Sequence, residues 1–281
     1  MKFGTLNLLL LTLLVGCGGG SSTPVPVVTT QQDITTTIKG TACNTNVDAL
    51  GSINFLSAHS VNERSYGCLI VDRSDGFPVL DGSKSARFEV RPWDCSSNGT
   101  FDDCYNDRSR HEIIDSSVWN NSTNGQIITY TTNLYIPKQE NFRPKGTSKY
   151  NPILFLGQII SLGGPSGFST LAFLEVNENT ELVLRPQILP QSATVEQVPL
   201  TANIFDRWIN VRYEIKSSHT AGYIKVYVDN ELRFEREQPT LLDANGSTGI
   251  KLGIYNAFKS GAVQTYSTQI IYYDNLHKSI Q

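Results

Sequence analysis

Three short segments place charged or hydrogen-bonding side chains inside apolar runs that are typical of β-strands. They are 87–91 (Arg-Phe-Glu-Val-Arg), 151–158 (Asn-Pro-Ile-Leu-Phe-Leu-Gly-Gln) and 251–256 (Lys-Leu-Gly-Ile-Tyr-Asn). Side chains alternate between the two faces of a strand, so Arg87, Glu89 and Arg91 share one face, and Lys251 shares a face with Tyr255. A sheet face of Arg, Glu, Gln, Lys and Tyr opposite an apolar face indicates a binding surface for an acidic ligand.

The elements that must position these residues are short strands rich in Val, Ile, Thr, Tyr and Phe, with Gly, Asn, Asp and Pro between them. No segment keeps a helical period beyond a turn or two. The pattern predicts an all-β fold, a jelly-roll β-sandwich (concanavalin-like) of two antiparallel sheets with a concave binding face. The clearest hairpin runs from Tyr223 to Phe234 around Asp229-Asn230, which tolerates the left-handed turn conformation. The expected strands are Cys68–Asp72, Arg87–Arg91, Arg110–Ile114, Gln126–Ile136, Ile153–Ile160, Thr170–Val176, Thr180–Leu184, Trp208–Ile215, Tyr223–Val228, Glu231–Glu235, Ile250–Tyr255 and Thr268–Tyr273.

Size and charge limit the class of partner. The chain has 281 residues, which is enough for one large sandwich. Its net charge of −3 and pI of about 5.8 give no basis for binding nucleic acid. An acidic ligand must therefore be held by local Arg and Lys side chains. We expect one domain at 41–281, acting as a monomer.

The N-terminus carries an export signal. Lys2 precedes a short apolar run that ends in Leu-Val-Gly-Cys at Cys17, which resembles a bacterial lipoprotein signal. The resemblance implies that Cys17 is lipidated; an ordinary signal peptide with an incidental cysteine is the alternative. Segment 1–17 is then the signal with its lipidated cysteine, and 18–40 is a flexible linker. We expect membrane contact through the lipid anchor only, at the outer membrane or surface of a Gram-negative cell.

The remaining cysteines are Cys43, Cys68, Cys95 and Cys104. An even number in an exported chain indicates two disulfides, for which three pairings exist. Short-range pairing predicts Cys43–Cys68 and Cys95–Cys104. A zinc site lacks Cys-x-x-Cys pairs and nearby histidines, so no metal is expected. An acidic cluster at Asp102, Asp103 and Asp107 is compatible with calcium, but its spacing is that of a solvated loop, and no cofactor is expected.

The order of the motifs resembles a known family. Arg87–Arg91, Arg110-His111-Glu112, Leu134–Pro137, Gln158, Asp206–Trp208, Val226–Asn230 and Lys251–Tyr255 follow one another as in β-jelly-roll polysaccharide lyases of the heparin lyase and glucuronan lyase type. The chain is also similar to jelly-roll alginate lyases, which share an Arg-x-Glu, a Gln-x-His and a Lys-x-Gly-x-Tyr strand. The resemblance covers about 86–275. One position departs from it, because Ile160 stands where those alginate lyases have the histidine.

The resemblance implies a polysaccharide lyase that cleaves a uronate-containing polysaccharide such as alginate or glucuronan by β-elimination. Gln158 and Arg110 would neutralise the substrate carboxylate, and Tyr255 would be the acid and also a candidate base. Lys251 would bind a sugar carboxylate or tune Tyr255. Arg87 and Arg91 would line neighbouring subsites, with Glu89 and Glu112 orienting the arginines.

Alternatives remain open at each position. Arg-x-Glu on one strand is often an ion pair without a ligand, and Gln158 and Tyr255 also suit buried structural roles. His111 is a candidate for the missing base, although strand alternation turns it away from Arg110. His59 lies in a loop-like stretch that could swing over the cleft. The alternative function is a non-catalytic carbohydrate-binding jelly roll on the cell surface.

Overall fold

The structure is a computed structural model. It describes residues 38–43, 55–59, 64–95, 102–119, 122–143, 145–146, 152–163, 167–187, 196–261 and 267–281, with 55–59 described by backbone alone. The predicted signal segment, Cys17 and nearly all of the predicted linker lie outside these residues. Among the described residues, no helix is long and apolar enough to cross a membrane.

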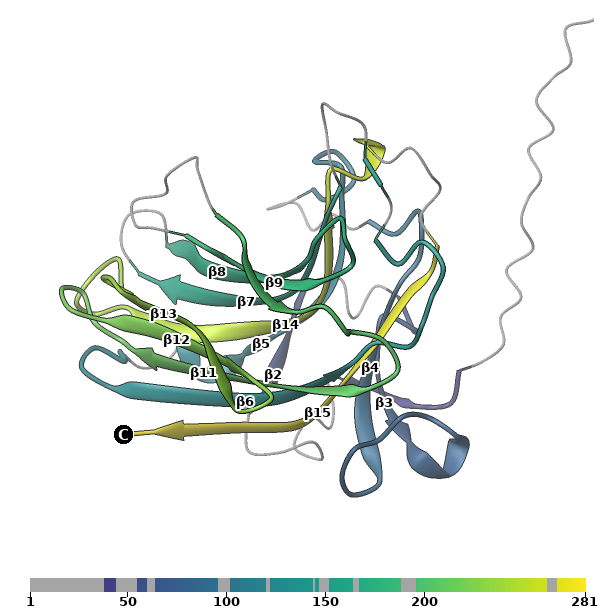
Figure 1. The fold of residues 1–281 in the computed structure, drawn as a ribbon, viewed down its shortest axis with the longest axis horizontal. Coiled ribbons are helices and arrows are strands. Elements are labelled where there is room, and N and C mark those ends of the chain that lie inside the picture. Colours follow the sequence, from purple (N-terminus) through teal and green to yellow (C-terminus); the bar gives the residue numbers. More distant parts are fainter. Residues whose placement is uncertain are drawn as a thin grey trace, which may run out of the picture. The chain divides into compact units, whose positions relative to one another are not determined.

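Two antiparallel sheets stack as layers (Figure 1). The eight-stranded sheet has the order β1-β3-β4-β15-β6-β11-β12-β13, and the seven-stranded sheet has the order β10-β9-β8-β7-β14-β5-β2. The strands are β1 (Thr41–Ala42), β2 (Phe55–His59), β3 (Cys68–Asp72), β4 (Lys84–Val90), β5 (Arg108–Asp115), β6 (Ile127–Tyr135), β7 (Ile153–Leu162), β8 (Phe168–Val176), β9 (Leu182–Pro186), β10 (Val198–Thr201), β11 (Trp208–Lys216), β12 (Tyr223–Val228), β13 (Glu231–Glu237), β14 (Ser247–Ala257) and β15 (Gln269–Ile280). Short 3-10 turns are η3 (Arg73–Asp75), η4 (Ser116–Trp119) and η5 (Lys259–Gly261).

The main core lies between the two sheets. Alternate residues of β11 and β12 are buried, as expected for strands with one core face and one solvent face. In β14, by contrast, every residue is buried, and β5 and β7 are buried over almost their whole length. The centre of the seven-stranded sheet is therefore packed on both faces, so its outer face, which points away from the eight-stranded sheet, carries a second layer of side chains.

The sequence pattern located most strands. β3 and β12 have the predicted bounds, and the predicted hairpin joins β12 to β13 with Asp229 and Asn230 at φ 51° and 68°. Strands β1, β2 and β10 were not predicted, because they are short or lack an apolar period of their own. His59 in particular ends β2 instead of lying in a loop.

Both predicted disulfides are present. Cys43–Cys68 joins the residue after β1 to the start of β3, and Cys95–Cys104 spans the connection between β4 and β5. The first crosslinks the chain at the edge of the eight-stranded sheet, and the second lies shortly before β5 of the seven-stranded sheet.

Candidate active site

Three neighbouring strands at the centre of the seven-stranded sheet bring the candidate residues together. Strand β14 lies between β7 and β5, where it pairs Lys251 with Gln158, and Tyr255 with Arg110. The next outward position of β5 is Glu112, opposite Gly253. We refer to Arg110, Glu112, Gln158, Lys251 and Tyr255 as the candidate site; each is 2–8% exposed.

Hydrogen bonds connect this group across the strands. The Gln158 Nε2 donates to Glu112 Oε1 over 2.5 Å, and Thr170 Oγ1 donates to Gln158 Oε1 over 3.3 Å. The Arg110 Nη1 lies 3.7 Å from Glu112 Oε2, a buried oxygen that has no hydrogen-bond partner among the described residues. Burial of a carboxylate oxygen without a full set of donors is costly, so such an oxygen marks a position where a ligand or proton can be accommodated.

Gly253 permits the close pairing of β14 with β5. Its φ is 141°, and a Cβ there would lie 2.1 Å from the His111 carbonyl oxygen, so no larger residue fits without movement of the strand. On the other side of β14, register shifts in the pairing with β7 fall between Leu252 and Tyr255. A further shift in the pairing of β7 with β8 falls between Phe155 and Gly157, which lets Phe155 and Gln158 both face outward.

Tyr255 lies between cations and aromatic rings. The Arg110 guanidinium carbon is 4.3 Å from the centre of the ring, and the ring of Phe155 lies 5.4 Å away on the other strand. Phe155 in turn stacks on Phe173 at 4.2 Å. Burial raises the pKa of the Tyr255 hydroxyl, while Arg110 and Arg108 oppose the rise. The phenol is therefore protonated at neutral pH, which suits a proton donor.

Lys251 is a buried cation on the same face. Burial lowers the pKa of its ammonium group, Glu112 acts in the opposite direction, and the Nζ atom lies 4.6 Å from the centre of the Phe168 ring. Arg110 and Arg108 both oppose the rise in the pKa of Tyr255. Tuning of Tyr255 by Lys251 stays a prediction. Binding of a carboxylate remains its predicted role.

Ile160 is fully buried in an apolar cluster on this side of the sheet. It packs with Ile114, Val118 and Leu162, next to the candidate site. Ile160 thus offers no proton-accepting group at the position where the family resemblance predicts a histidine.

Asp103 has a role in the candidate site that the sequence pattern did not predict. The sequence spacing predicts a solvated loop there, yet Asp103 is 1% exposed and binds Arg110 through two hydrogen bonds, from Nε to Oδ2 at 2.7 Å and from Nη2 to Oδ1 at 2.5 Å. Its position between the motifs gave no periodic signal. Among the described residues, no cluster of His, Cys, Asp and Glu could hold a metal ion.

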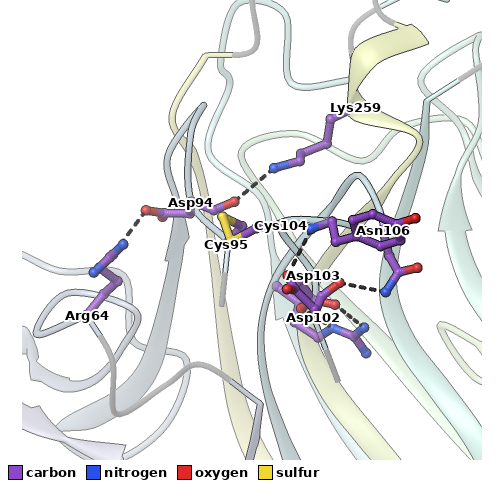
Figure 2. The surroundings of a disulfide bond; sticks show 10 residues. Arg64, Asp94, Cys95, Asp102, Asp103, Cys104, Asn106 and Lys259 are labelled. Atoms are coloured by element: carbon purple, nitrogen blue, oxygen red, sulfur yellow. Dashed lines mark hydrogen bonds and ion pairs between the residues drawn. A yellow bond between two sulfur atoms is a disulfide. The ribbon is translucent and has the colours of Figure 1, made fainter. Parts of the chain in front are cut away.

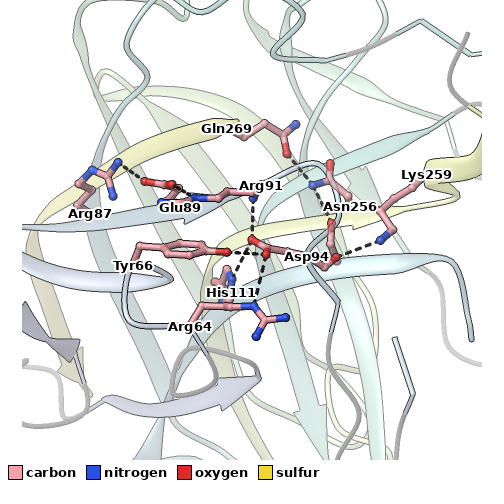
Figure 3. A network of polar contacts seen from close by, with 11 residues as sticks. Arg64, Tyr66, Arg87, Glu89, Arg91, Asp94, His111, Asn256, Lys259 and Gln269 are labelled. Carbon is pink, nitrogen blue, oxygen red and sulfur yellow. Dashed lines mark hydrogen bonds and ion pairs between the residues drawn. The ribbon is translucent and has the colours of Figure 1, made fainter. Parts of the chain in front are cut away.

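The first arginine motif lies elsewhere, and this corrects its assignment to substrate subsites. Arg87 and Glu89 belong to β4 in the eight-stranded sheet, where Glu89 accepts from both Arg87 and Arg91 (Figure 3). Phe88 and Val90 face the core, so this ion pair faces the opposite side, away from the seven-stranded sheet. It is the structural ion pair that Arg-x-Glu also permits.

His111 is likewise corrected. Its ring lies on the core side of β5, 1% exposed, with Nε2 3.5 Å from Asp94 Oδ2 and the ring edge against Tyr66 (Figure 3). A Cβ on Gly67 would come within 2.5 Å of it, so the ring is tightly enclosed. Because Arg110 faces outward, alternation removes His111 from the candidate site.

Comparison with known proteins then decides the family. A family model described as polysaccharide lyase matches residues 73–277, which include every residue of the candidate site. The chain belongs to the polysaccharide lyase family. No curated protein matches it. The match supports an enzyme that acts on polysaccharides and gives no support to a non-catalytic binding module.

Solved structures agree with this polysaccharide lyase in fold. An endo-β-1,4-glucuronan lyase from the fungus Trichoderma reesei is 15% identical, with a TM-score of 0.53, covering 83% of this chain and 92% of its own. The alginate lyase AlgAT5 from polysaccharide lyase family 7 is 14% identical, with a TM-score of 0.52 and coverages of 80% and 88%. A substrate complex of the family 7 alginate lyase A1-II' is 13% identical, with a TM-score of 0.53 and coverages of 85% and 97%. At these identities the likeness concerns the jelly-roll fold.

Proposed function

We propose that this lyase cleaves a uronate-containing acidic polysaccharide by β-elimination at the candidate site. The observation that carries the proposal is the contact chain from Gln158 through Glu112 and Arg110 to Tyr255 on one face of the sheet. The similar folds include a glucuronan lyase and an alginate lyase, and both glucuronan and alginate are polymers of uronic acids.

The reaction requires neutralisation of the uronate carboxylate. Removal of the proton at C5 places negative charge on that carboxylate, and the bond from C4 to the linking oxygen then breaks. Pre-placed donors stabilise such charge most effectively. Arg110 supplies a guanidinium and Gln158 supplies an amide NH2 with a second hydrogen besides the one given to Glu112. Both are held by neighbours before substrate arrives, so little rearrangement is needed.

Tyr255 is assigned as the acid that protonates the leaving oxygen. Its raised pKa keeps the hydroxyl protonated at neutral pH, and Arg110 beside the ring would stabilise the phenolate formed after proton transfer. The same shift makes Tyr255 a poor base at the start of the reaction, because it must first lose a proton that its burial retains.

We assign the base to His59 from backbone register. Strand β2 pairs with β5 so that the backbone of His59 lies opposite Glu112, after a register shift between Ser57 and His59. An imidazole has the pKa range that suits a base near neutral pH. The change His59→Gln should lower turnover by about 10²-fold, since this is the loss expected for a proton-transfer group.

The function is tested by incubating the purified protein with a panel of polyuronates that includes alginate and glucuronan. Each elimination leaves a C4–C5 double bond conjugated to the carboxylate, which absorbs in the ultraviolet. A rise in absorbance with at least one polymer is the expected result. Retention on a polyuronate column without any rise would favour the binding module instead.

We also propose that the chain is a lipoprotein anchored through Cys17. The supporting observation is the Leu-Val-Gly-Cys signal followed by a Gly-, Ser- and Pro-rich segment. The change Cys17→Ser should move the protein from the membrane fraction to the soluble fraction of its cell, and an unchanged distribution would refute the anchor. An outer-membrane or surface location and a monomeric state stay predictions.

A further inference from the structure

The connection between β4 and β5 carries a repeated arrangement at its disulfide. Each cysteine directly follows an aspartate, in Asp94-Cys95 and in Asp103-Cys104, and Figure 2 shows both aspartates beside the sulfur bridge. Both carboxylates are buried, at 6% and 1% exposed. Buried carboxylates in a loop need partners, so the question is what these two hold.

Asp103 holds Arg110. Its two oxygens accept from Nε and Nη2 of the guanidinium, and its carbonyl oxygen accepts from the Arg108 backbone at 2.8 Å, which fixes the carboxylate at the start of β5. Two parallel hydrogen bonds set the plane as well as the position of a guanidinium. Asp103 thus binds the Nε and Nη2 side of the guanidinium, whereas Glu112 lies nearest to Nη1 on the other side.

Asp94 lies near His111, whose side chain is on the opposite face of β5 from that of Arg110. It accepts from the Tyr66 hydroxyl and the Arg91 amide, both at 2.7 Å, and lies 3.5 Å from His111 (Figure 3). Lys259, in the turn that follows β14, donates to the Asp94 carbonyl at 3.0 Å. Cys95 is therefore anchored to the fold through its neighbour, and it can anchor Cys104 in turn.

Arg110 and His111 are consecutive and point to opposite faces of β5, so the two aspartates contact the strand from both sides. We propose that Asp103 is a positioning residue for Arg110, and that the Cys95–Cys104 disulfide keeps it in place by tying it to the Asp94 network. This inference rests on the proposed function of Arg110. Without Asp103, the guanidinium would turn toward Glu112, compete with Gln158 for it and leave the position that the substrate carboxylate requires.

The first test compares the two disulfides of the chain. Cys95→Ser with Cys104→Ser should lower kcat/KM on the cleaved polyuronate by about tenfold or more, because displacement of a catalytic group by about 1 Å is already costly. The matched control, Cys43→Ser with Cys68→Ser, removes a bridge at the edge of the eight-stranded sheet and should change kcat/KM by less than about twofold at a temperature where circular dichroism shows both variants folded. Equal effects of the two pairs would overturn the proposal.

The second test does not depend on activity. The Nε–H proton of Arg110 should give a slowly exchanging NMR signal in the wild type, assigned by its loss in Arg110→Lys, because it is buried and bonded to Asp103. Asp103→Asn and the Cys95/Cys104 variant should lose that protection, whereas Asp102→Asn in the same loop should keep it. Retained protection in the two test variants would refute the positioning role. A wild type that cleaves no polyuronate but shows this pattern would refute the proposed function alone.

Discussion

The protein contains the same local pattern twice, with different outcomes. Arg87-Phe88-Glu89 lies on β4 of the eight-stranded sheet, and Arg110-His111-Glu112 lies on β5 of the seven-stranded sheet. Both arginines and both glutamates are buried. On β4 the glutamate accepts hydrogen bonds from two arginines of its own segment.

On β5 a residue from outside the pattern changes the arrangement. Asp103 takes the hydrogen bonds of Arg110, so Glu112 is left to accept from Gln158 on a different strand. The outer face near β4 is otherwise filled by an apolar and aromatic cluster that includes Leu69, Val71 and Tyr272. The comparison shows that an additional acid, Asp103, frees the glutamate of an Arg-x-Glu pair to bond with a residue of another strand, and a reactive site can be built on that link.

The largest effect should come from the tyrosines of the two regions. Tyr255→Phe removes one hydroxyl and should cut turnover by about 10²-fold or more while leaving polymer retention intact, since a proton-transfer group is lost. Tyr272→Phe, beside Arg87, is the matched control and should stay within about twofold of the wild type because it lies on the other sheet. Steady-state kinetics measures both; full activity of Tyr255→Phe would show that the acid is misassigned.

A slightly smaller loss is expected for Gln158→Ala. It removes a donor to the substrate carboxylate and deprives Glu112 of its hydrogen bond, at a cost of about 3 kcal/mol in the transition state. Gln139→Ala, whose amide bonds to the backbone of Ile270 in the eight-stranded sheet, controls for loss of a glutamine side chain. The comparison of kcat/KM for the two variants checks this; equal losses would make Gln158 a structural residue.

Lys251 should have a smaller, pH-dependent effect. Burial lowers the pKa of its ammonium, so the charge is present below that pKa and is lost as pH rises through it, earlier than for an exposed lysine. KM for the acidic polymer should therefore rise on the alkaline side. Lys251→Arg stays charged and should flatten this limb, with a change of about a few-fold near neutral pH. An identical alkaline limb in wild type and variant would exclude Lys251 from binding. Tyr255 does not predict such a limb near neutrality, because its pKa is raised.

Glu89→Gln should affect stability but not catalysis. The change leaves the buried Arg87 without its carboxylate partner, and breaking a buried pair costs about 3 kcal/mol. Denaturant unfolding should show the loss, while kcat/KM measured under folding conditions should stay within about twofold. A tenfold loss of kcat/KM in a fully folded variant would place β4 back in the catalytic machinery.

Local pattern predicted much of this fold and part of the site. Alternation placed Lys251 with Tyr255, and Arg110 with Glu112, on outward faces, and short-range pairing predicted both disulfides. What it missed depends on long-range pairing. Whether an Arg-x-Glu strand joins the sheet of Gln158 is decided by which strand lies beside it, and the role of Asp103 depends on a contact made by a loop. The register that places His59 opposite Glu112 has the same origin.

The most direct test of the central claim is the rate of ultraviolet-absorbing product formed from one cleaved polyuronate by Arg110→Lys and Arg87→Lys, measured side by side on folded protein. Lysine keeps the positive charge but cannot form the bidentate hydrogen bonds with a carboxylate that a guanidinium forms. The account predicts that Arg110→Lys loses about tenfold or more in kcat/KM, whereas Arg87→Lys remains within about twofold of the wild type. Loss of activity in Arg87→Lys with full activity in Arg110→Lys would contradict the assignment of the site to β5.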